Sequence, residues 1–303
     1  GTRPGSSTPV HVVREMFIAF SRSSFGFIML RSVLFTLIAA GSAIAGDWPM
    51  VRCDAARAGA TEERLPAVLD LLWTHRPGQA PRPAWPAPAR GSYWQRLDSI
   101  EPRVVDDEAF QPVAGGGAVY FGSSADDQVH CLEAATGKVR WTFFTDGPVR
   151  YAPVLHNGRV FAGSDDGWVY CLDAEHGGLI WRARCSPDDL RVSGNGRMIS
   201  AWPVRTGLVV LDGRVFVLAG LYPSQGVYAC SFDAEDGSLV WREGLDTYSP
   251  QGYLMASASR LYVPTGRTDP IALDRRTGKF VQAYSGVGGT YALLAGDTLV
   301  AGR

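Results

Sequence analysis

Short apolar runs separated by turn-forming residues recur along most of the chain. Between residues 151 and 183 the runs lie at 152–155, 159–163, 168–173 and 179–183. The turn between the first two runs contains Asn157-Gly158, a dipeptide that tolerates the positive φ values required by tight hairpin turns. Runs of this length with turns between them predict short antiparallel strands rather than helices.

One segment of eleven residues recurs four times. It has a small residue first, an apolar residue second, an acid third, a glycine seventh and, in three copies, a tryptophan eleventh. The copies begin at Cys131, Cys171, Ser231 and Ala272, their glycines are Gly137, Gly177, Gly237 and Gly278, and their last residues are Trp141, Trp181, Trp241 and Gln282. The glycines are 40, 60 and 41 residues apart, so the second interval holds one period plus an insertion of 20 residues. Four short strands in each period of about 40 residues are typical of a β-propeller blade.

The repeat predicts an all-β fold, namely a β-propeller of four-stranded antiparallel blades over residues 104–303. The blades are expected at about 110–143, 151–183, 207–243 and 254–284, followed by the start of a fifth at Gly289. The propeller is therefore expected to be incomplete, and the sequence to be a fragment of a longer chain. An outer strand is predicted near 69–74, and we hypothesise that it completes an absent final blade.

The segment before the propeller divides into three parts. Residues 1–28 are interpreted as an upstream or unstructured segment. Residues 29–45 have the basic start, the apolar run and the small residues before a cut after Ala45 that are typical of a signal peptide, which predicts export to the periplasm or the extracellular space and no membrane span in the mature form. Residues 46–103 are expected to form an N-terminal strap, whose proline-rich stretch at 76–95 crosses one face of the propeller.

Charge and cysteine usage narrow the possible chemistry. The 29 basic and 30 acidic side chains give a formal net charge of −1, so no overall field would attract nucleic acid. The five cysteines include no C-x-x-C motif, and Cys131 and Cys171, at matching positions of the repeat, are interpreted as small buried residues. Four Asp-Asp pairs could ligate calcium, but none has EF-hand spacing, so no metal site is expected.

The repeat resembles the tryptophan-docking motif of the pyrroloquinoline-quinone (PQQ) repeat superfamily, whose members include quinoprotein alcohol dehydrogenases, the outer-membrane-assembly propeller and exported bacterial propellers. Segments 146–153, 163–167 and 249–267 most resemble exported planctomycete-type propellers. The resemblance implies that the three repeat tryptophans lie on outer strands and pack on the turn of a neighbouring blade. They are therefore expected to be structural.

Strand order predicts that one face of the propeller collects the loops between second and third strands and the connections between blades. The insertion at 184–206 lies on this face, and long loops on a rigid scaffold are the usual place for function. The candidate cofactor-binding or ligand residues of this rim are Arg150, Tyr151, Asp165, Asp166, Arg191, Arg197, Trp202, Gln251, Tyr253 and Arg267. Guanidinium groups bind carboxylate or phosphate and aromatic rings stack on sugars, so an anionic or carbohydrate ligand is one hypothesis. The alternative is that the arginines pair with Asp165, Asp166, Asp188 and Asp189 and only order the loops.

Three functions remain open. The favoured one is a non-catalytic binding or scaffold propeller for a protein or carbohydrate partner, with no catalytic residue and no cofactor. The second is a quinoprotein dehydrogenase of alcohols or sugars, with PQQ and calcium in the central funnel and a carboxylate as base. The sequence has no adjacent cysteine pair and no haem motif, both of which the resemblance associates with such enzymes. The third is a propeller that serves an enzymatic domain beyond residue 303.

Overall fold

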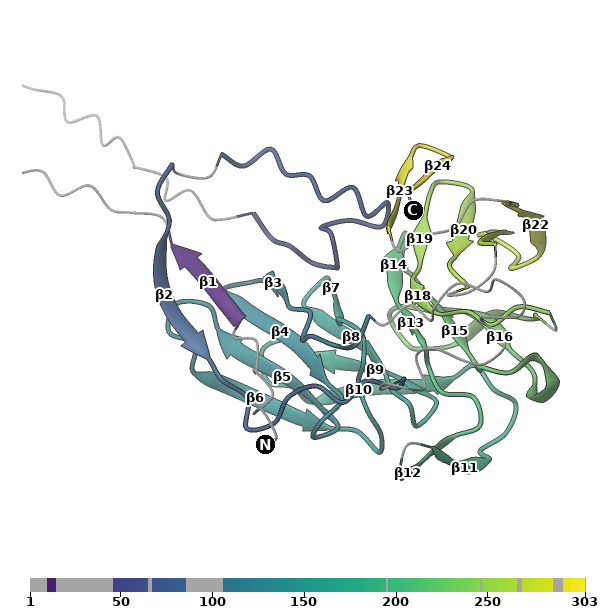
Figure 1. Cartoon of the computed structure of the whole chain (residues 1–303), viewed down its shortest axis with the longest axis horizontal. Coiled ribbons are helices and arrows are strands. Elements are labelled where there is room, and N and C mark those ends of the chain that lie inside the picture. Colours follow the sequence, from purple (N-terminus) through teal and green to yellow (C-terminus); the bar gives the residue numbers. More distant parts are fainter. Residues whose placement is uncertain are drawn as a thin grey trace, which may run out of the picture.

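The computed structural model of this protein is built almost entirely from short β-strands. It describes residues 10–14, 46–64, 67–85, 106–194, 196–245, 247–265, 269–285 and 291–302. The described residues include four four-stranded antiparallel sheets, set around a common centre like the blades of a propeller (Figure 1). The predicted all-β architecture of four-stranded blades is confirmed.

Each blade is a meander in which sequential strands pair. Blade 1 consists of β3 (Val113–Gly115), β4 (Ala118–Ser123), β5 (Gln128–Glu133) and β6 (Val139–Phe144). Blade 2 consists of β7 (Val154–His156), β8 (Arg159–Gly163), β9 (Trp168–Asp173) and β10 (Leu179–Arg184). Blade 3 consists of β14 (Val209–Leu211), β15 (Arg214–Ala219), β16 (Tyr228–Asp233) and β17 (Leu239–Gly244). Blade 4 consists of β19 (Met255–Ala256), β20 (Arg260–Val263), β21 (Ile271–Asp274) and β22 (Phe280–Ala283), and the hairpin of β23 (Tyr291–Ala295) and β24 (Thr298–Gly302) follows it.

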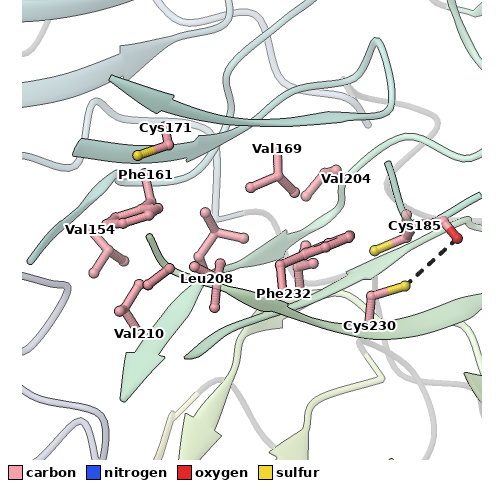
Figure 2. Packing of buried hydrophobic residues seen from close by; sticks show 14 of the residues in the cluster. Val154, Phe161, Val169, Cys171, Cys185, Val204, Leu208, Val210, Cys230 and Phe232 are labelled. Atoms are coloured by element: carbon pink, nitrogen blue, oxygen red, sulfur yellow. Dashed lines mark hydrogen bonds between the residues drawn. The ribbon is translucent and has the colours of Figure 1, made fainter. Parts of the chain in front are cut away.

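The core lies between neighbouring blades. The middle strands are buried on both faces, whereas the outer strands alternate between buried and exposed positions, as in β10. Figure 2 shows the layer between blades 2 and 3, where Phe161 and Val154 of one blade face Val210 and Phe232 of the next. Branched and aromatic side chains suit strands of this kind because they fill the space between two pleated surfaces.

The indole rings of the outer strands contact the next blade at equivalent points. Trp141 Nε1 donates to the carbonyl oxygen of Ala174 at 3.1 Å, and Trp181 Nε1 donates to that of Ala234 at 3.2 Å. Each ring covers the repeat glycine of the following blade, so that a Cβ added to Gly177 would lie 2.5 Å from Trp141 Cδ2. Gly237 and Gly278 meet Trp181 and Trp241 in the same way. Only a residue without a side chain leaves room for the ring at this position.

These contacts predict different effects for two glycines with the same backbone geometry. Gly177 has φ 71° and Gly158 has φ 72°, but nothing lies within 4 Å of a Cβ added to Gly158. Gly158→Ala should therefore lower the free energy of unfolding by only about 1 kcal/mol, through backbone strain. Gly177→Ala adds a clash with Trp141 and should lower it by about 2–4 kcal/mol, measured by urea denaturation. Equal losses would contradict this account of the indole contact.

Strand β2 (Asp70–His75) contacts blade 1 in the same way that β6, the outer strand of blade 1, contacts blade 2. Trp73 Nε1 donates to the carbonyl oxygen of Ala134 at 2.8 Å, and a Cβ on Gly137 would lie 2.6 Å from Trp73 Cδ2. This is the repeat contact of the other tryptophans. β2 also pairs antiparallel with β1 (Val10–Arg14), which falls in the segment interpreted as upstream or unstructured. The idea that the strand near 69–74 completes a final blade stays a prediction.

The insertion after blade 2 forms a hairpin and then enters the core. β11 (Arg191–Gly194) pairs antiparallel with β12 (Arg197–Ser200), and the two strands project from the propeller (Figure 1). Residues 199–210 are all buried. The returning chain forms β13 (Thr206–Gly207), which pairs in parallel with β18 (Gly252–Tyr253) just before blade 4. A 3₁₀ turn, η1 (Pro223–Gln225), closes the loop between β15 and β16.

Residues 46–59, called the axial segment below, run through the centre of the ring. The segment forms backbone hydrogen bonds with the innermost strands of blades 1, 2 and 4 and with β23, through the pairs Trp48–Ala114, Pro49–Leu155, Ala55–Ala256 and Ala56–Leu294. Because innermost strands line the central channel of a propeller, these contacts place the segment inside that channel. The predicted signal peptide at 29–45 and residues 86–103 of the strap lie outside the described residues. The part of the chain that is described holds no helix long and apolar enough to span a membrane.

Candidate functional site

A buried ion network joins three segments of the propeller near its centre. Asp165, in the turn after β8, accepts hydrogen bonds from Arg205 Nε at 2.6 Å and Nη2 at 3.0 Å, and from Arg150 Nε at 2.7 Å. Arg150 Nη1 also reaches Asp107 Oδ2 at 2.7 Å. The side chains of Asp165, Arg150 and Arg205 are 0%, 4% and 4% exposed. The two carboxylates and two guanidiniums therefore neutralise each other out of contact with water.

The strap closes over this network. The carbonyl oxygen of Arg82 accepts a hydrogen bond of 2.5 Å from Arg150 Nη1, and Ala84 N donates to Asp107 Oδ2 at 2.8 Å. Burial alone would lower the pKa of Arg150, but the charges of Asp165 and Asp107 outweigh it and hold that pKa above its usual value. Arg150 thus stays charged and links the strap to the ring. Arg82 and Ala84, in the described part of the predicted strap, contact this network, and the course of the whole strap over the face stays a prediction.

Below the network, side chains fill the axis of the ring. Tyr253 donates its hydroxyl proton to Gln111 Oε1 and packs edge-on against Tyr151, with ring centroids 5.2 Å apart. The ring of Tyr253 lies against Gly207, where an added Cβ would come within 2.1 Å of it. The guanidinium carbon of Arg57, from the axial segment, lies 5.4 Å from the centroid of the Tyr253 ring. The axis is therefore occupied by the protein's own residues.

Arg57 is the largest fully buried side chain of the described residues. Its guanidinium donates to three backbone carbonyl oxygens, those of Val51 at 2.9 Å, Leu208 at 2.8 Å and Leu254 at 3.0 Å. Burial lowers the pKa of Arg57 to about 10, so the group remains protonated at neutral pH. A cation held by three backbone carbonyl oxygens and placed beside the Tyr253 ring ties the axial segment to the chain just before blades 3 and 4.

Asp106 is the titratable group of this centre with a pKa near neutrality. Burial, and then the charge of Asp107, raise the pKa of Asp106 from 3.8 to about 6. The folded state therefore holds a proton on Asp106 over a pH range in which the unfolded chain has released it. Raising the pH through that range removes stability, because the charged carboxylate is less well accommodated in the folded state.

Asp106→Asn should consequently stabilise the protein at pH 8. We expect a gain of about 1–3 kcal/mol in the free energy of unfolding at pH 8, and little gain at pH 4, where Asp106 is protonated in the native protein. Urea denaturation of both proteins from pH 4 to pH 8 measures the difference. Asp189→Asn, at an exposed carboxylate, is the matched control and should leave the pH profile unchanged. A variant with the same pH profile as the wild type would contradict the assignment.

The structure gives the described arginines of the predicted rim internal partners. Arg197 pairs with Asp127, Arg191 Nε lies 3.6 Å from Asp189, and Arg150 is buried in the ion network. This is the arrangement in which arginines order the loops, and among the described residues it leaves no unpaired arginine of the predicted set to receive an anion. Arg267 lies outside the described residues.

The other predicted residues serve packing and hydrogen bonding. Asp166 accepts hydrogen bonds from the Tyr170 hydroxyl at 2.6 Å and from the backbone N–H groups of Asp146 and Trp168. Trp202 is buried and donates to the carbonyl oxygen of Gln225 at 2.7 Å. Gln251 is buried beside Thr265, where the two residues form a parallel β-bridge. Cys131 and Cys171 are fully buried, which confirms that they are small core residues.

We call the surface around the inserted hairpin the insertion face. It consists of residues 190–194 and 196–202, which include the inserted hairpin, and of the loops 123–128, 164–167 and 221–226. Three contacts hold them together: the Arg197–Asp127 pair, the hydrogen bond of 2.8 Å from Ser200 N to the carbonyl oxygen of Asp165, and the Trp202–Gln225 bond. Three large apolar side chains remain exposed there, namely Leu190 (54%), Met198 (56%) and Tyr222 (49%).

Sequence reasoning missed several of these residues. Arg57, Asp107 and Arg205 hold the centre together but belong to no repeat. Asp107 bonds to Arg150 43 residues away, Arg205 bonds to Asp165 40 residues away, and the farthest partner of Arg57 is 197 residues away. Leu190 and Met198 are apolar residues of the insertion, but the sequence does not separate them from Ile199 and Trp202, which are buried.

The centre of the ring does not fit a quinone with calcium in the part of the chain that the structure describes. Calcium takes six to eight oxygen ligands, but Asp165 and Asp107 already bind guanidinium groups. The space that a flat cofactor would need on the axis is filled by Tyr253, Tyr151 and Arg57. No group of three or more His, Cys, Asp or Glu side chains that could hold a metal ion occurs within the described ranges.

Comparison with known proteins assigns the family. A family model described as outer membrane protein assembly factor BamB matches residues 71–226 and again 153–286, which together make up more than half of the chain. The chain belongs to the PQQ-like β-propeller repeat family. Two overlapping matches agree with the internal repeat, since the same motifs align in more than one position.

Relatives in this PQQ-like family are named for different functions. The outer membrane protein assembly factor BamB of Yersinia pestis is 27% identical over 176 residues, which cover 56% of this chain and 42% of that protein. The dehydrogenase subunit of the quinone alcohol dehydrogenase of Komagataeibacter europaeus is 26% identical over 169 residues, which cover 49% of this chain and 22% of that protein. The chain thus spans less than half the length of both relatives.

Solved structures show the same fold. The quinohemoprotein alcohol dehydrogenase from Comamonas testosteroni matches with a TM-score of 0.54 at 19% identity, over 81% of this chain and 42% of that one. A europium-containing methanol dehydrogenase matches with a TM-score of 0.51 at 14% identity, over 79% of this chain and 49% of that one. At these identities the likeness concerns the propeller and not the chemistry.

Proposed function

We propose that this PQQ-like propeller is a non-catalytic binding or scaffold module that recognises a protein partner through its insertion face, outside the cytoplasm. The observation that carries the proposal is the filled axis. Arg57, Tyr253 and the Arg150–Asp165–Arg205 network occupy the place where a propeller enzyme would hold a cofactor. A propeller with a filled centre is left with its loops as the surface available for recognition.

The chemistry of the insertion face favours a protein over a small anion. The arginines of the face are engaged in internal ion pairs, so an anion would have to break them. Leu190, Met198 and Tyr222 instead offer apolar surface with charged residues around it. Exposed apolar groups rimmed by polar ones are typical of protein–protein contacts, in which aromatic residues and methionine are enriched.

The test compares two double variants of the full chain. Leu190→Asp with Met198→Asp should weaken capture of partners, from an extract of the native cell envelope, by at least about tenfold, because charges replace the apolar centre of the contact. Val139→Asp with Leu239→Asp changes residues of similar exposure (54% and 46%) on the outer strands and should leave capture unchanged. Cross-linking followed by mass spectrometry identifies the partner. Equal capture by the two variants would refute the assignment of the face, and binding of a glycan panel instead would favour a carbohydrate ligand.

Dehydrogenation of alcohols is the second candidate, because relatives at 26% identity are named as quinone alcohol dehydrogenases. Dye-linked oxidation of an alcohol panel by the protein, supplied with PQQ and calcium, tests it. We expect no turnover above that of the free cofactor, because the axis has no room for it. Turnover that is lost on heat denaturation would overturn the non-catalytic proposal. An enzymatic domain elsewhere in a longer chain is compatible with the binding role and is tested by the sequence of the full gene.

A further inference from the structure

Two buried cysteines lie against each other where the insertion leaves blade 2. Cys185 directly follows β10, Cys230 lies in β16, and neither has exposed surface. The Cys230 thiol donates to the carbonyl oxygen of Cys185, with Sγ 3.7 Å from that oxygen, and the side chains of the two cysteines interact directly. Figure 2 shows the two side chains approaching each other at one end of the layer between blades 2 and 3.

The other cysteines have different neighbours. The thiol of Cys131 contacts Tyr120, and that of Cys171 contacts Arg159. Cys53 lies partly exposed beside Asp54. Within the described residues, Cys185 and Cys230 are therefore the one pair whose sulfur atoms are placed to react with each other. A disulfide needs this proximity of two side chains, which sequence spacing alone does not reveal.

We propose that Cys185 and Cys230 form a disulfide when the chain folds in an oxidising compartment, and that this bond fastens the start of the insertion to blade 3. The oxidant is a disulfide, either a small molecule or a protein. The thiolate of one cysteine attacks it, forms a mixed disulfide and releases one thiol. The second thiolate then displaces the other sulfur, so two electrons and two protons pass from the protein to the oxidant, which leaves as two thiols.

The position of the pair explains when the bond would form and what it would hold. Burial raises the pKa of the Cys185 thiol well above its usual value, so the folded protein contains little thiolate there. Exchange must then occur before the blades close, and the finished bond is sheltered from reductants. The bond would span 45 residues and enclose the β11–β12 hairpin and Arg205 of the ion network. It would limit the freedom of the insertion face in the unfolded chain and so stabilise the fold.

The experiment compares the full chain made in a bacterial periplasm with the same chain made in a reducing cytosol, both trapped with an alkylating reagent in denaturant. We expect three reactive thiols instead of five in the periplasmic protein. Trypsin should release peptides 185–191 and 215–242 joined and two hydrogen atoms lighter than their sum. Reduction should lower the Tm of this protein by about 5–10 °C.

Two variants make the result specific. Cys131→Ala, which places in blade 1 the residue that blade 4 carries at Ala272, should keep both the joined peptides and the Tm shift. Cys185→Ala should lose both. Five reactive thiols in the periplasmic wild type, or a mixture of cysteine pairs, would overturn the proposal. The thiol count and the peptide masses do not depend on any partner, so they test the disulfide separately from the proposed binding role.

Discussion

Asp165→Ala is expected to lower the free energy of unfolding by about 3–5 kcal/mol. The carboxylate is fully buried and holds both Arg150 and Arg205. Its removal leaves Arg205 without its ion pair and Arg150 with Asp107 alone. A buried guanidinium cannot recover its hydration, so most of the loss is the cost of that uncompensated charge.

The matched control is Asp189→Ala. The Asp189 carboxylate also pairs with two arginines, Arg184 at 2.9 Å and Arg191 at 3.6 Å, but its side chain is 47% exposed. Water replaces the lost partner there, and we expect a loss of about 0–1 kcal/mol. Urea denaturation followed by circular dichroism at pH 7 measures both variants. A loss below about 1 kcal/mol for Asp165→Ala would mean that the network is not as dry as the structure shows.

Trp181→Ala is expected to lower the free energy of unfolding by about 3–5 kcal/mol, because it leaves a cavity at the contact between blades 2 and 3. The side chain is 8% exposed, covers Gly237 and packs against Phe161 with ring centroids 5.8 Å apart. Its indole N–H is also lost as the donor to Ala234. Trp181→Phe keeps a ring but not the donor, and we expect it to cost about 1–2 kcal/mol, since the hydrogen bond and part of the packing are removed.

Trp241→Ala provides the comparison within the same repeat. Trp241 makes the equivalent hydrogen bond, to the carbonyl oxygen of Arg275 at 3.2 Å, but it is only partly buried. Trp241→Ala should therefore lower the free energy of unfolding by less than Trp181→Ala does, with a difference of about 1 kcal/mol or more. Thermal and urea unfolding measure the series. A larger loss for Trp241→Ala than for Trp181→Ala would contradict the idea that indole burial between blades sets the effect.

The repeat made the fold predictable. The interval of about 40 residues between Gly137 and Gly177 fixes a unit of four strands, and the predicted second blade at 151–183 agrees with the observed strands from Val154 to Arg184. The signal is strong because every copy must leave room for the same ring over the same glycine. Local sequence therefore carries enough information about blade boundaries.

The centre of the ring was not predictable in the same way. The sequence left two roles open for Arg150, a ligand contact or a pairing with an aspartate of the loops, and in the structure it bonds to Asp165 and Asp107, residues 15 and 43 positions away. No periodicity in the sequence connects such partners. The sequence around an arginine does not show whether its guanidinium group binds a ligand anion or an aspartate of the protein. The axial segment was likewise hidden, since Arg57 bonds to backbone carbonyl groups, which any sequence offers.

The filled axis is the central claim, and amide hydrogen exchange of the full chain, with and without PQQ and calcium, tests it most directly. The backbone N–H of Trp48, in the axial segment, donates to the carbonyl oxygen of Ala114 in blade 1, and the N–H of Ala114 donates to the carbonyl oxygen of Trp48. We predict that peptides covering residues 47–57 exchange as slowly as the innermost strands and that added quinone and calcium leave this protection unchanged. Fast exchange of the axial segment in the free protein, or new protection of Tyr151 and Tyr253 on adding the quinone, would contradict the account.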